Sequence, residues 1–346
     1  MNWLKNIWED EHKFNILVSI TFFTGVILIV STYAWLSVNL NAKVDFFNIV
    51  ASNQDGLTIS LDGNTFSSSV DISEDAIIND LKNTYANHTN QWAKRGLFPI
   101  STNGTQTVNN DKFHILGASK IAYKINSLSR KRYLNARVVS EERSNNKGIF
   151  IAFDLFLKNV VSGSPNSDNL YLDQGTSVSL TSDEYSDADG AINSVRFGFL
   201  KIGSVPLEAS LDAVQNQSCN NNCEAVIYEP HSTNHSQASI ERARRYGVNL
   251  INGIPNPTYA LINPGNHLEL ASGQYGSGVR LDTEHFALQN TITSFARPIF
   301  QIPEGITKVR VYVWLEGQDM DSIESFSSGS VIKIAINFVK DTAAYQ

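Results

Sequence analysis

The chain has 346 residues and a formal net charge of -7, and 42% of its residues are hydrophobic. This length and hydrophobic content allow a folded core, and the mild acidity gives no reason to expect nucleic-acid binding. A repeat array, a Walker motif, a dinucleotide fingerprint and a G-x-S-x-G elbow are all absent from the sequence, which excludes the protein classes that those patterns mark.

An uncharged and largely apolar stretch occupies residues 14–37. A helix rises about 1.5 Å per residue, so this stretch is long enough to cross the roughly 30 Å hydrocarbon core of a bilayer. Lys5 and Lys13 precede it and no charge follows it in residues 38–42, which favours an N-terminus inside the cell. The predicted organisation is a cytoplasmic stub (1–13), a transmembrane signal-anchor helix (14–37) and an extracytoplasmic domain (38–346).

A cleaved signal peptide is the alternative interpretation of the same stretch. Thr32 and Ala34 are small residues at the two positions that a signal peptidase inspects. Cleavage after Ala34 would free a loose terminal strand with Phe46 and Phe47, which could add to the sheet edge of a neighbouring copy and build a filament. The apolar stretch is longer than an ordinary signal h-region, which favours the retained anchor.

Alternating segments after residue 42 predict strands. Residues 43–52 form the first, and in the second Leu57, Ile59 and Leu61 alternate with polar residues, as in a half-buried strand. Residues 148–159 are apolar on both faces, which indicates a central strand. Further strands are predicted at residues 170–173, 176–180, 194–203 and 224–230.

The best helix after the apolar stretch is predicted at residues 73–94. Ser73 is a suitable N-cap, and acidic residues follow it in the first turn. A single helix among strands normally caps the structure or lies across a sheet edge.

Two strongly alternating segments lie near the C-terminus, at residues 308–319 and 331–339. Valines and a leucine line one face of the first, and isoleucines and a phenylalanine line one face of the second. We expect them to be adjacent antiparallel strands. The fold class predicted from about ten such strands is mainly β, an antiparallel β-sandwich of jelly-roll or immunoglobulin-like type with insertions.

Several segments together resemble a group of uncharacterised bacterial, mostly Gram-positive, surface proteins that have one N-terminal hydrophobic segment and a β-sandwich ectodomain. They are, in order, YAWLS, GLTISLDG, AFDLFLKN, NLYLD, SVRFGFL, VIYEP and VRVYVWLEGQD. The end of the hydrophobic segment also resembles the signal region of camelysin and of TasA-type biofilm-fibre proteins. Neither resemblance implies any catalytic residue in this chain.

Cys219 and Cys223 have a C-x3-C spacing within an Asn-rich stretch. In an oxidising compartment the pair predicts a local disulfide. A metal site here would need at least two further ligands.

Asp183, Asp187 and Asp189 form an acidic stretch that ends in Gly190. Clustered carboxylates before a glycine can wrap Ca²⁺, although the full EF-hand pattern is missing. The alternative is a solvated acidic loop.

His231 and His235 form an H-x3-H pair, a spacing that can hold a metal on a helix. Pro230 and the polar residues between the histidines indicate a loop, and no H-E-x-x-H is present, so we do not expect this pair to bind metal. A metallopeptidase of the camelysin kind would need such a site.

Glu316, Asp319 and Asp321 follow the first of the two C-terminal strands. Paired carboxylates can do acid–base work, but they more often accept hydrogen bonds from turn amides, and we expect the second role.

These patterns together predict a non-enzymatic, membrane-anchored cell-surface protein of structural or adhesive type. It would contact the lipid bilayer through residues 14–37 and would have itself, the cell wall or another protein as a partner. The alternatives are a released biofilm-fibre subunit, a camelysin-like metallopeptidase, and a glycan- or partner-binding module that uses residues 247–277. No catalytic residue is predicted, and no cofactor other than Ca²⁺.

Overall fold

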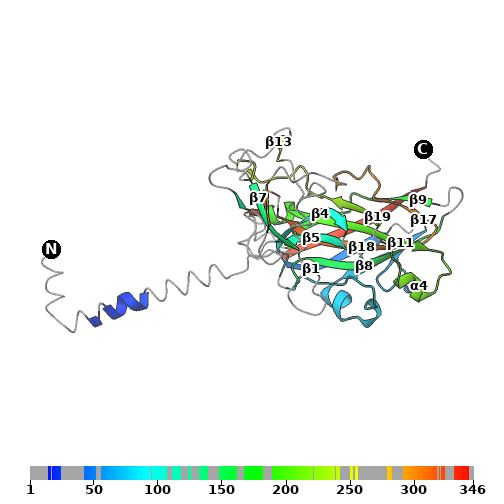
Figure 1. The fold of residues 1–346 in the computed structure, drawn as a ribbon, viewed down its shortest axis with the longest axis horizontal. Helices are drawn as coiled ribbons and strands as arrows, with labels where there is room; N and C mark the ends of the chain where they lie inside the picture. Colours follow the sequence, from blue (N-terminus) through cyan, green and yellow to red (C-terminus); the bar gives the residue numbers. More distant parts are fainter. Residues whose placement is uncertain are drawn as a thin grey trace. The chain divides into compact units, whose positions relative to one another are not determined.

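The computed structural model (Figure 1) divides into two units, Met1–Leu40 and Asn41–Gln346. The described residues are 15–16, 18–24, 43–51, 56–94, 96–106, 111–117, 124–125, 132–138, 148–161, 167–181, 189–220, 222–237, 239–241, 250–251, 254–255, 279–282, 291–317, 319, 321–323 and 331–342.

In the first unit, residues 15–16 and 18–24 are helical, and their large apolar side chains are exposed. Ile20 is 58% exposed and Phe22 is 66% exposed. Within the described residues, no helix has both the length and the apolar character needed to cross a membrane. Most of the predicted span at 14–37 lies outside the described residues, so the anchor and the cleavage at Ala34 both stay predictions.

The second unit is mainly β, as predicted, and its two large sheets are mixed and open. The smaller, six-stranded sheet is called the minor sheet here. Its strand order is β17 (Phe300–Pro303), β9 (Ser167–Leu172), β19 (Val331–Thr342), β1 (Lys43–Ala51) and β3 (Ser69–Ile72), with β10 (Ser177–Leu180) also paired to β19.

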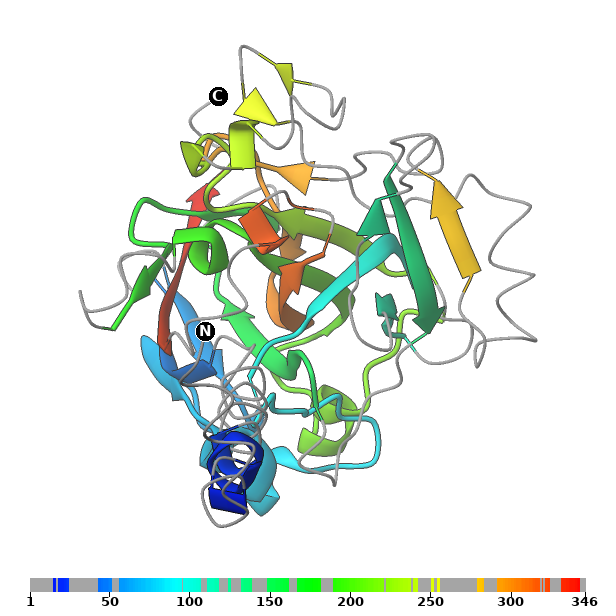
Figure 2. The same ribbon diagram turned by 90° about the vertical axis from the view of Figure 1, so that its left-hand side faces the viewer.

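The larger, eleven-stranded sheet is called the major sheet. Its main path is β15 (Val279–Asp282), β7 (Arg132–Val138), β5 (Phe113–Gly117), β4 (Pro99–Gln106), β18 (Gly305–Glu316), β11 (Val195–Val205), β12 (Glu224–Tyr228) and β16 (Thr291–Ile292). Off this path, β8 (Ile151–Asn159) pairs with β18 and β2 (Leu57–Ser60), and β6 (Lys124–Ile125) pairs with β7. Figure 2 shows β7 and β15 side by side, and a separate hairpin joins β13 (Leu250–Ile251) to β14 (Ile254–Pro255).

The expected purely antiparallel pairing is wrong. β1 pairs with β19 in parallel, and so do β4 with β18 and β12 with β16. Each of these parallel pairs joins strands that are far apart in the sequence. Short turns can impose antiparallel pairing only on neighbouring strands, whereas distant segments meet in whichever direction buries their apolar faces.

Apolar core residues alternate along β18 and along β19, as predicted. The two strands are not neighbours, however, which corrects the expectation of an antiparallel pair. β18 pairs with β8, β11 and β4 in the major sheet, whereas β19 pairs with β1, β9 and β10 in the minor sheet. The apolar faces of both strands enter one hydrophobic cluster from opposite sides. Alternation identifies the buried face of a strand, but it does not determine which strand pairs with it.

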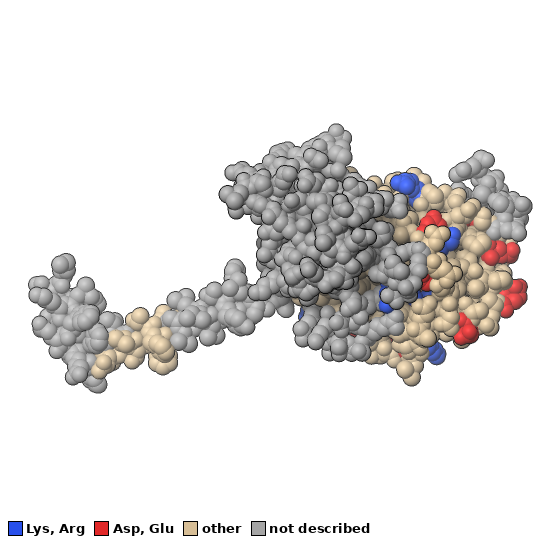
Figure 3. Space-filling view, in the orientation of Figure 1, with Lys and Arg blue, Asp and Glu red and all other residues tan. Residues whose placement is uncertain are grey.

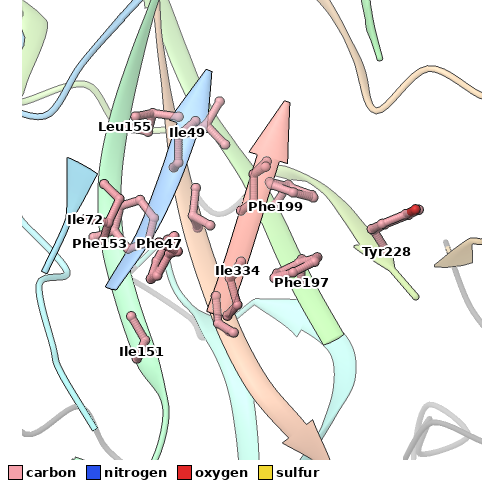
Figure 4. Close-up of a cluster of buried hydrophobic side chains, with 14 of the residues drawn as sticks. Phe47, Ile49, Ile72, Ile151, Phe153, Leu155, Phe197, Phe199, Tyr228 and Ile334 are labelled. Carbon is pink, nitrogen blue, oxygen red and sulfur yellow. The ribbon is translucent and has the colours of Figure 1, made fainter. Parts of the chain in front are cut away.

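That cluster is the main core, and it lies between the two sheets (Figure 4). Phe47 of β1 lies 5.5 Å from Phe153 of β8, measured between ring centroids. Phe199 of β11 and Phe338 of β19 make a second ring contact across the sheets, at 5.8 Å. The sheets therefore bury one face each against the other.

The major sheet also buries its second face. Tyr312 and Trp314 of β18 lie in a separate hydrophobic cluster, where the ring of Tyr312 is 5.0 Å from that of Phe113 on β5. As a result, every residue of β18 is buried. Polar side chains on this face are therefore shielded from water as well.

The long helix predicted at residues 73–94 is wrong. Only a π-helical turn, η2 (Asp75–Asn79), and a 3₁₀ turn, η3 (Leu81–Asn83), form there. Ser73 does act as a cap, since its hydroxyl oxygen accepts a hydrogen bond from the backbone N–H of Ala76. Asp80 then accepts the amide of Lys82, and such local side-chain hydrogen bonds compete with a continuing helix in this Asn- and Asp-rich stretch.

β1 is not a loose terminal strand, which corrects that part of the filament prediction. It lies between β19 and β3, and its Phe47 and Ile49 side chains are fully buried. The strand is held by backbone pairing on both edges and by the core contacts of one face. Leaving this position would expose an apolar slot in the minor sheet.

Candidate functional site

A buried group of charged side chains lies where β11 begins and β18 ends, and it is called the His235 cluster. Arg196 of β11 holds two carboxylates through one guanidinium nitrogen, with 2.6 Å to Glu229 and 2.6 Å to Asp319. All three side chains are at most 1% exposed. The remaining members of the cluster are His235 and Asp321.

His235 faces the carboxylates with one ring nitrogen. Its Nδ1 lies 2.5 Å from Oδ2 of Asp321 and 4.0 Å from Oδ1 of Asp319. The other oxygen of Asp321 accepts the Ser236 amide at 3.0 Å, and Oδ1 of Asp319 accepts the Asp321 amide at 2.9 Å. The Nε2 atom of His235 is buried and has no hydrogen-bond partner within the described part of the chain.

The carboxylates control the titration of this ring. Burial by itself lowers the pKa of His235, but the Asp321 hydrogen bond and the charges of Asp319, Asp321 and Glu229 outweigh it and raise the pKa above 6.5. Burial raises the pKa of Asp321, but the hydrogen bonds from His235 and Ser236 lower it by more. The pKa of Asp321 therefore lies below 3.8. The cluster thus favours positive charge at the position of the imidazole.

Three potential ligand atoms in this cluster, one each from His235, Asp319 and Asp321, all lie within 4.8 Å of one another. The expected role of the Asp319 side chain, acceptance of a turn amide, is present here. Glu316 accepts the indole N–H of Trp314 at 3.1 Å.

His231 does not join His235. Its Nε2 lies 3.2 Å from the carbonyl oxygen of Val178, and its Nδ1 lies 3.3 Å from the side chain of Asn234. Burial and the positive charge of Arg196 lower its pKa below 6.5, against the Val178 hydrogen bond, which raises it. The H-x3-H pair therefore forms no shared site among the described residues.

The remaining predicted site residues have separate positions. Cys219 and Cys223 are joined as a disulfide in this structure, beside Asp111, whose carboxylate lies 4.0 Å from the Cys223 sulfur. Asp183 and Asp187 lie outside the described residues, and Asp189 begins the short helix α3 (Asp189–Asn193). The Ca²⁺ prediction stays a prediction. Of residues 247–277, only β13 and β14 are described.

A second buried charge group, called the Asp154 cluster, lies on β8 and β18. Asp154 accepts from Arg310 at 3.0 Å, from Lys308 at 3.1 Å and from the Tyr85 hydroxyl at 2.5 Å. Burial raises the pKa of Asp154, but Lys308 and Arg310 outweigh it and hold the pKa below 3.8. Burial also lowers the pKa of Lys308, in part offset by Asp154.

A third buried pair ties the end of β19 to β9. Lys340 donates to Asp168 at 2.9 Å, to the side chain of Asn159 at 2.9 Å and to the carbonyl oxygen of Val160 at 2.9 Å. These contacts connect the minor sheet to the end of β8 in the major sheet. The ion pair itself lies within the minor sheet, and the other hydrogen bonds of the same ammonium group reach the major sheet.

A cavity of about 520 Å³ opens beside the first residue of β1. Lys43, Glu74, Asp75, Trp92 and Lys94 line it together with Val44, Ser73, Ala93 and Val331. Lys94 and Glu74 form an ion pair of 3.1 Å at its rim. Its lining therefore combines both signs of charge with the edge of a mostly buried indole.

Sequence reasoning missed the His235 cluster as a unit, because its members are brought together only by the fold. His235 and Asp321 are 86 residues apart in the sequence. The available signal was Arg196 between the apolar residues Val195 and Phe197, since a charge on a strand that is buried on both faces needs carboxylate partners nearby.

No family model, no curated protein and no solved structure matches the chain, and the resemblance to Gram-positive surface proteins and to the camelysin and TasA-type proteins stays a prediction.

Proposed function

We propose that the chain is a single-span, membrane-anchored surface protein, and that its extracytoplasmic domain is a β-sandwich of jelly-roll or immunoglobulin-like type with a structural or adhesive role. Residues 14–37 are the anchor in this proposal, and no catalysis is assigned. The bacterial cell surface is its location.

The observation that carries the proposal is the closed state of the buried charge groups. The charged side chains and the imidazole of the His235 cluster, and the charged side chains of the Asp154 cluster, are at most 1% exposed. A substrate cannot reach groups that are buried in this way, whereas such pairs fix the relative position of strands. Figure 3 shows the exposed Lys, Arg, Asp and Glu side chains scattered over the described part of the face in view. The buried ion pairs, which fix neighbouring strands, support a rigid scaffold.

The helical residues 15–16 and 18–24 support the anchor. Their apolar side chains are exposed, which is costly in water and favourable in lipid. The hydroxyl of Ser19 donates to the Asn15 carbonyl at 2.8 Å, and that of Thr24 donates to the Ile20 carbonyl at 2.7 Å. Hydroxyls turned back onto the helix in this way suit an apolar environment.

Membrane fractionation combined with protease protection tests the proposal. The full-length protein should stay in the membrane after alkaline carbonate extraction, and added protease should digest its large domain in intact cells. A protein that is recovered in the soluble fraction, or that is protected until the membrane is broken, contradicts the anchor and its orientation. Turnover of peptide or glycan substrates by the purified full-length protein contradicts the non-catalytic assignment.

The cavity beside β1 favours a second candidate, a module that binds a cell-wall glycan or a protein partner. Its volume of about 520 Å³ suits a small ligand, and its lining offers charged groups and the edge of Trp92. Binding of soluble cell-wall glycan fragments to the full-length protein, measured by calorimetry, should weaken in Lys94→Gln while the fold persists. Equal binding by both forms argues against this cavity.

A further inference from the structure

We propose that His235, Asp319 and Asp321 together bind a divalent transition-metal ion of the zinc type, as a buried structural ion. The inference does not depend on the proposed surface role. The ion would tie the segment after β12, which carries His235, to the segment after β18, which carries both aspartates. These are the two chain segments that close the end of the major sheet beside Arg196.

The distances between the three ligand atoms suit such an ion. Zinc bonds of about 2.0–2.2 Å place neighbouring ligand atoms roughly 3.0–3.4 Å apart in tetrahedral or octahedral geometry. Nδ1 of His235 is now 2.5 Å from one aspartate oxygen and 4.0 Å from the other, and the three ligand atoms lie within 4.8 Å. Shifts below about 1 Å bring them to the distances of a complex.

The carboxylates are already oriented for this role. Arg196 holds Oδ2 of Asp319 at 2.6 Å, which leaves Oδ1 on the side of the imidazole. The Ser236 amide holds Oδ1 of Asp321 at 3.0 Å, which leaves Oδ2 toward Nδ1 of His235. Outer partners that fix ligand carboxylates in this manner are a regular feature of metal sites.

The imidazole of His235 is also oriented toward the two aspartates. A buried imidazole ordinarily satisfies both of its nitrogens. In the described part of the chain, the polar contacts of His235 all lie on the Nδ1 side, and Nε2 is buried without a hydrogen bond. The ring is thus held where Nδ1 meets two carboxylates rather than within a wider hydrogen-bond network.

Charge favours a divalent ion. Three carboxylates, those of Glu229, Asp319 and Asp321, surround the imidazole together with the single guanidinium of Arg196 in the described region. Buried carboxylates need compensating positive charge, and a divalent ion beside Arg196 supplies it for all three. The imidazole ligand favours zinc-type ions over Ca²⁺ or Mg²⁺, which prefer oxygen ligands alone. Because the side chains of the three ligands are at most 1% exposed, the site is closed, as structural zinc sites are.

The test is zinc binding by the full-length protein in detergent after removal of metals with a chelating resin. Equilibrium dialysis against Zn²⁺, with excess Mg²⁺ and Ca²⁺ present, should give one zinc per chain by elemental analysis. His235→Gln and Asp321→Asn should each weaken the affinity about 100-fold or more. The matched control is His231→Gln, which changes a histidine on the same segment outside the cluster and should leave the affinity within about threefold of the wild type.

X-ray absorption of the zinc-loaded wild-type protein keeps the proposal testable if a variant fails to fold. The expected spectrum has nitrogen and oxygen neighbours with one imidazole and no sulfur. A sulfur neighbour would place the zinc at Cys219 and Cys223, and it would overturn the assignment. Wild-type protein that binds no zinc, or binds it no more tightly than Asp321→Asn, would overturn it as well.

Discussion

Replacing Asp154 with asparagine should destabilise the domain strongly, because Asp154 lies between two buried cations. Its carboxylate is 3.0 Å from Nε of Arg310 and 3.1 Å from Nζ of Lys308, and each of the three side chains is at most 1% exposed. Asparagine has nearly the same shape but carries no charge. The change therefore removes the compensating charge while the packing of β8 against β18 is kept.

The expected loss is about 3–5 kcal/mol, the range for removal of one partner from a buried ion pair. For a domain of this size, such a loss lowers the midpoint of thermal unfolding by roughly 5 to 8 °C. The matched control is Glu224→Gln, which breaks a pair on β11 and β12 whose nitrogen and oxygen are 3.5 Å apart and whose Glu224 side chain is 54% exposed. Exposed pairs contribute about 0–1 kcal/mol, so this variant should unfold near the wild-type temperature.

Thermal unfolding of the full-length protein in detergent, followed by near-UV circular dichroism, makes the comparison. If Asp154→Asn unfolds at the same temperature as Glu224→Gln, the reasoning is refuted, because the buried charges would then not need their carboxylate.

The pH dependence gives a second readout of Asp154. Its pKa in the folded protein lies below the ordinary 3.8, so its ionised form stabilises the fold at all pH values above the ordinary pKa. This stabilisation is lost as the pH falls through the folded-state pKa. The difference in unfolding temperature between the wild type and Asp154→Asn should stay constant between about pH 5 and 8 and should shrink below about pH 4.

Three further changes have defined outcomes. Lys340→Met leaves its carboxylate partner buried without its ammonium group and should cost about 3–5 kcal/mol in urea unfolding; a loss below about 1 kcal/mol contradicts this. Gly305→Ala places a Cβ 2.2 Å from the carbonyl oxygen of Val205 at a φ of +135°. It should lower the free energy of unfolding by about 1–3 kcal/mol in the same assay, and an unchanged midpoint argues against the strain. Deletion of residues 1–37 should move the protein from the membrane fraction to the soluble fraction, and continued membrane association would show that another segment anchors it.

Local patterns predicted the strongly alternating strands, because the period of a strand depends on which of its faces is buried, but they missed β3, β4, β5, β7 and β17. Val195, Phe197 and Phe199 alternate in the sequence, and all three enter the main core. The partners of the strands depend on contacts between distant segments, so the same reasoning placed β18 beside β19, although the two strands lie in opposite sheets. The helix at 73–94 failed for a different reason, because its apolar spacing was outweighed by side-chain hydrogen bonds such as that of Asp80.

The candidate site was harder to predict than the strands. Arg196 alternates with the core residues Val195 and Phe197, a position where a charged residue usually meets water, yet it is 0% exposed because both faces of the major sheet are buried here. The second face is covered by distant strands of the same sheet, such as β4 and β5, and His235 meets Asp321 from another distant segment, so local patterning predicts neither contact. The carboxylates at 319 and 321 were noticed, and their role in a turn was predicted, but their histidine neighbour was not.

The parallel pairing of β1 with β19 has a consequence for the order in which the protein is made. The ribosome produces β1 long before β19, and roughly 15 to 60 s of synthesis separate the two strands at about 5–20 residues per second. β3 can cover one edge of β1 early, because it follows soon after in the sequence. The other edge of β1, beside the Phe47 and Ile49 side chains that are fully buried in the folded protein, stays unpaired until β19 is made. During that interval a nascent chain presents an open strand to its surroundings, so a chain that ends before residue 331 should aggregate rather than fold.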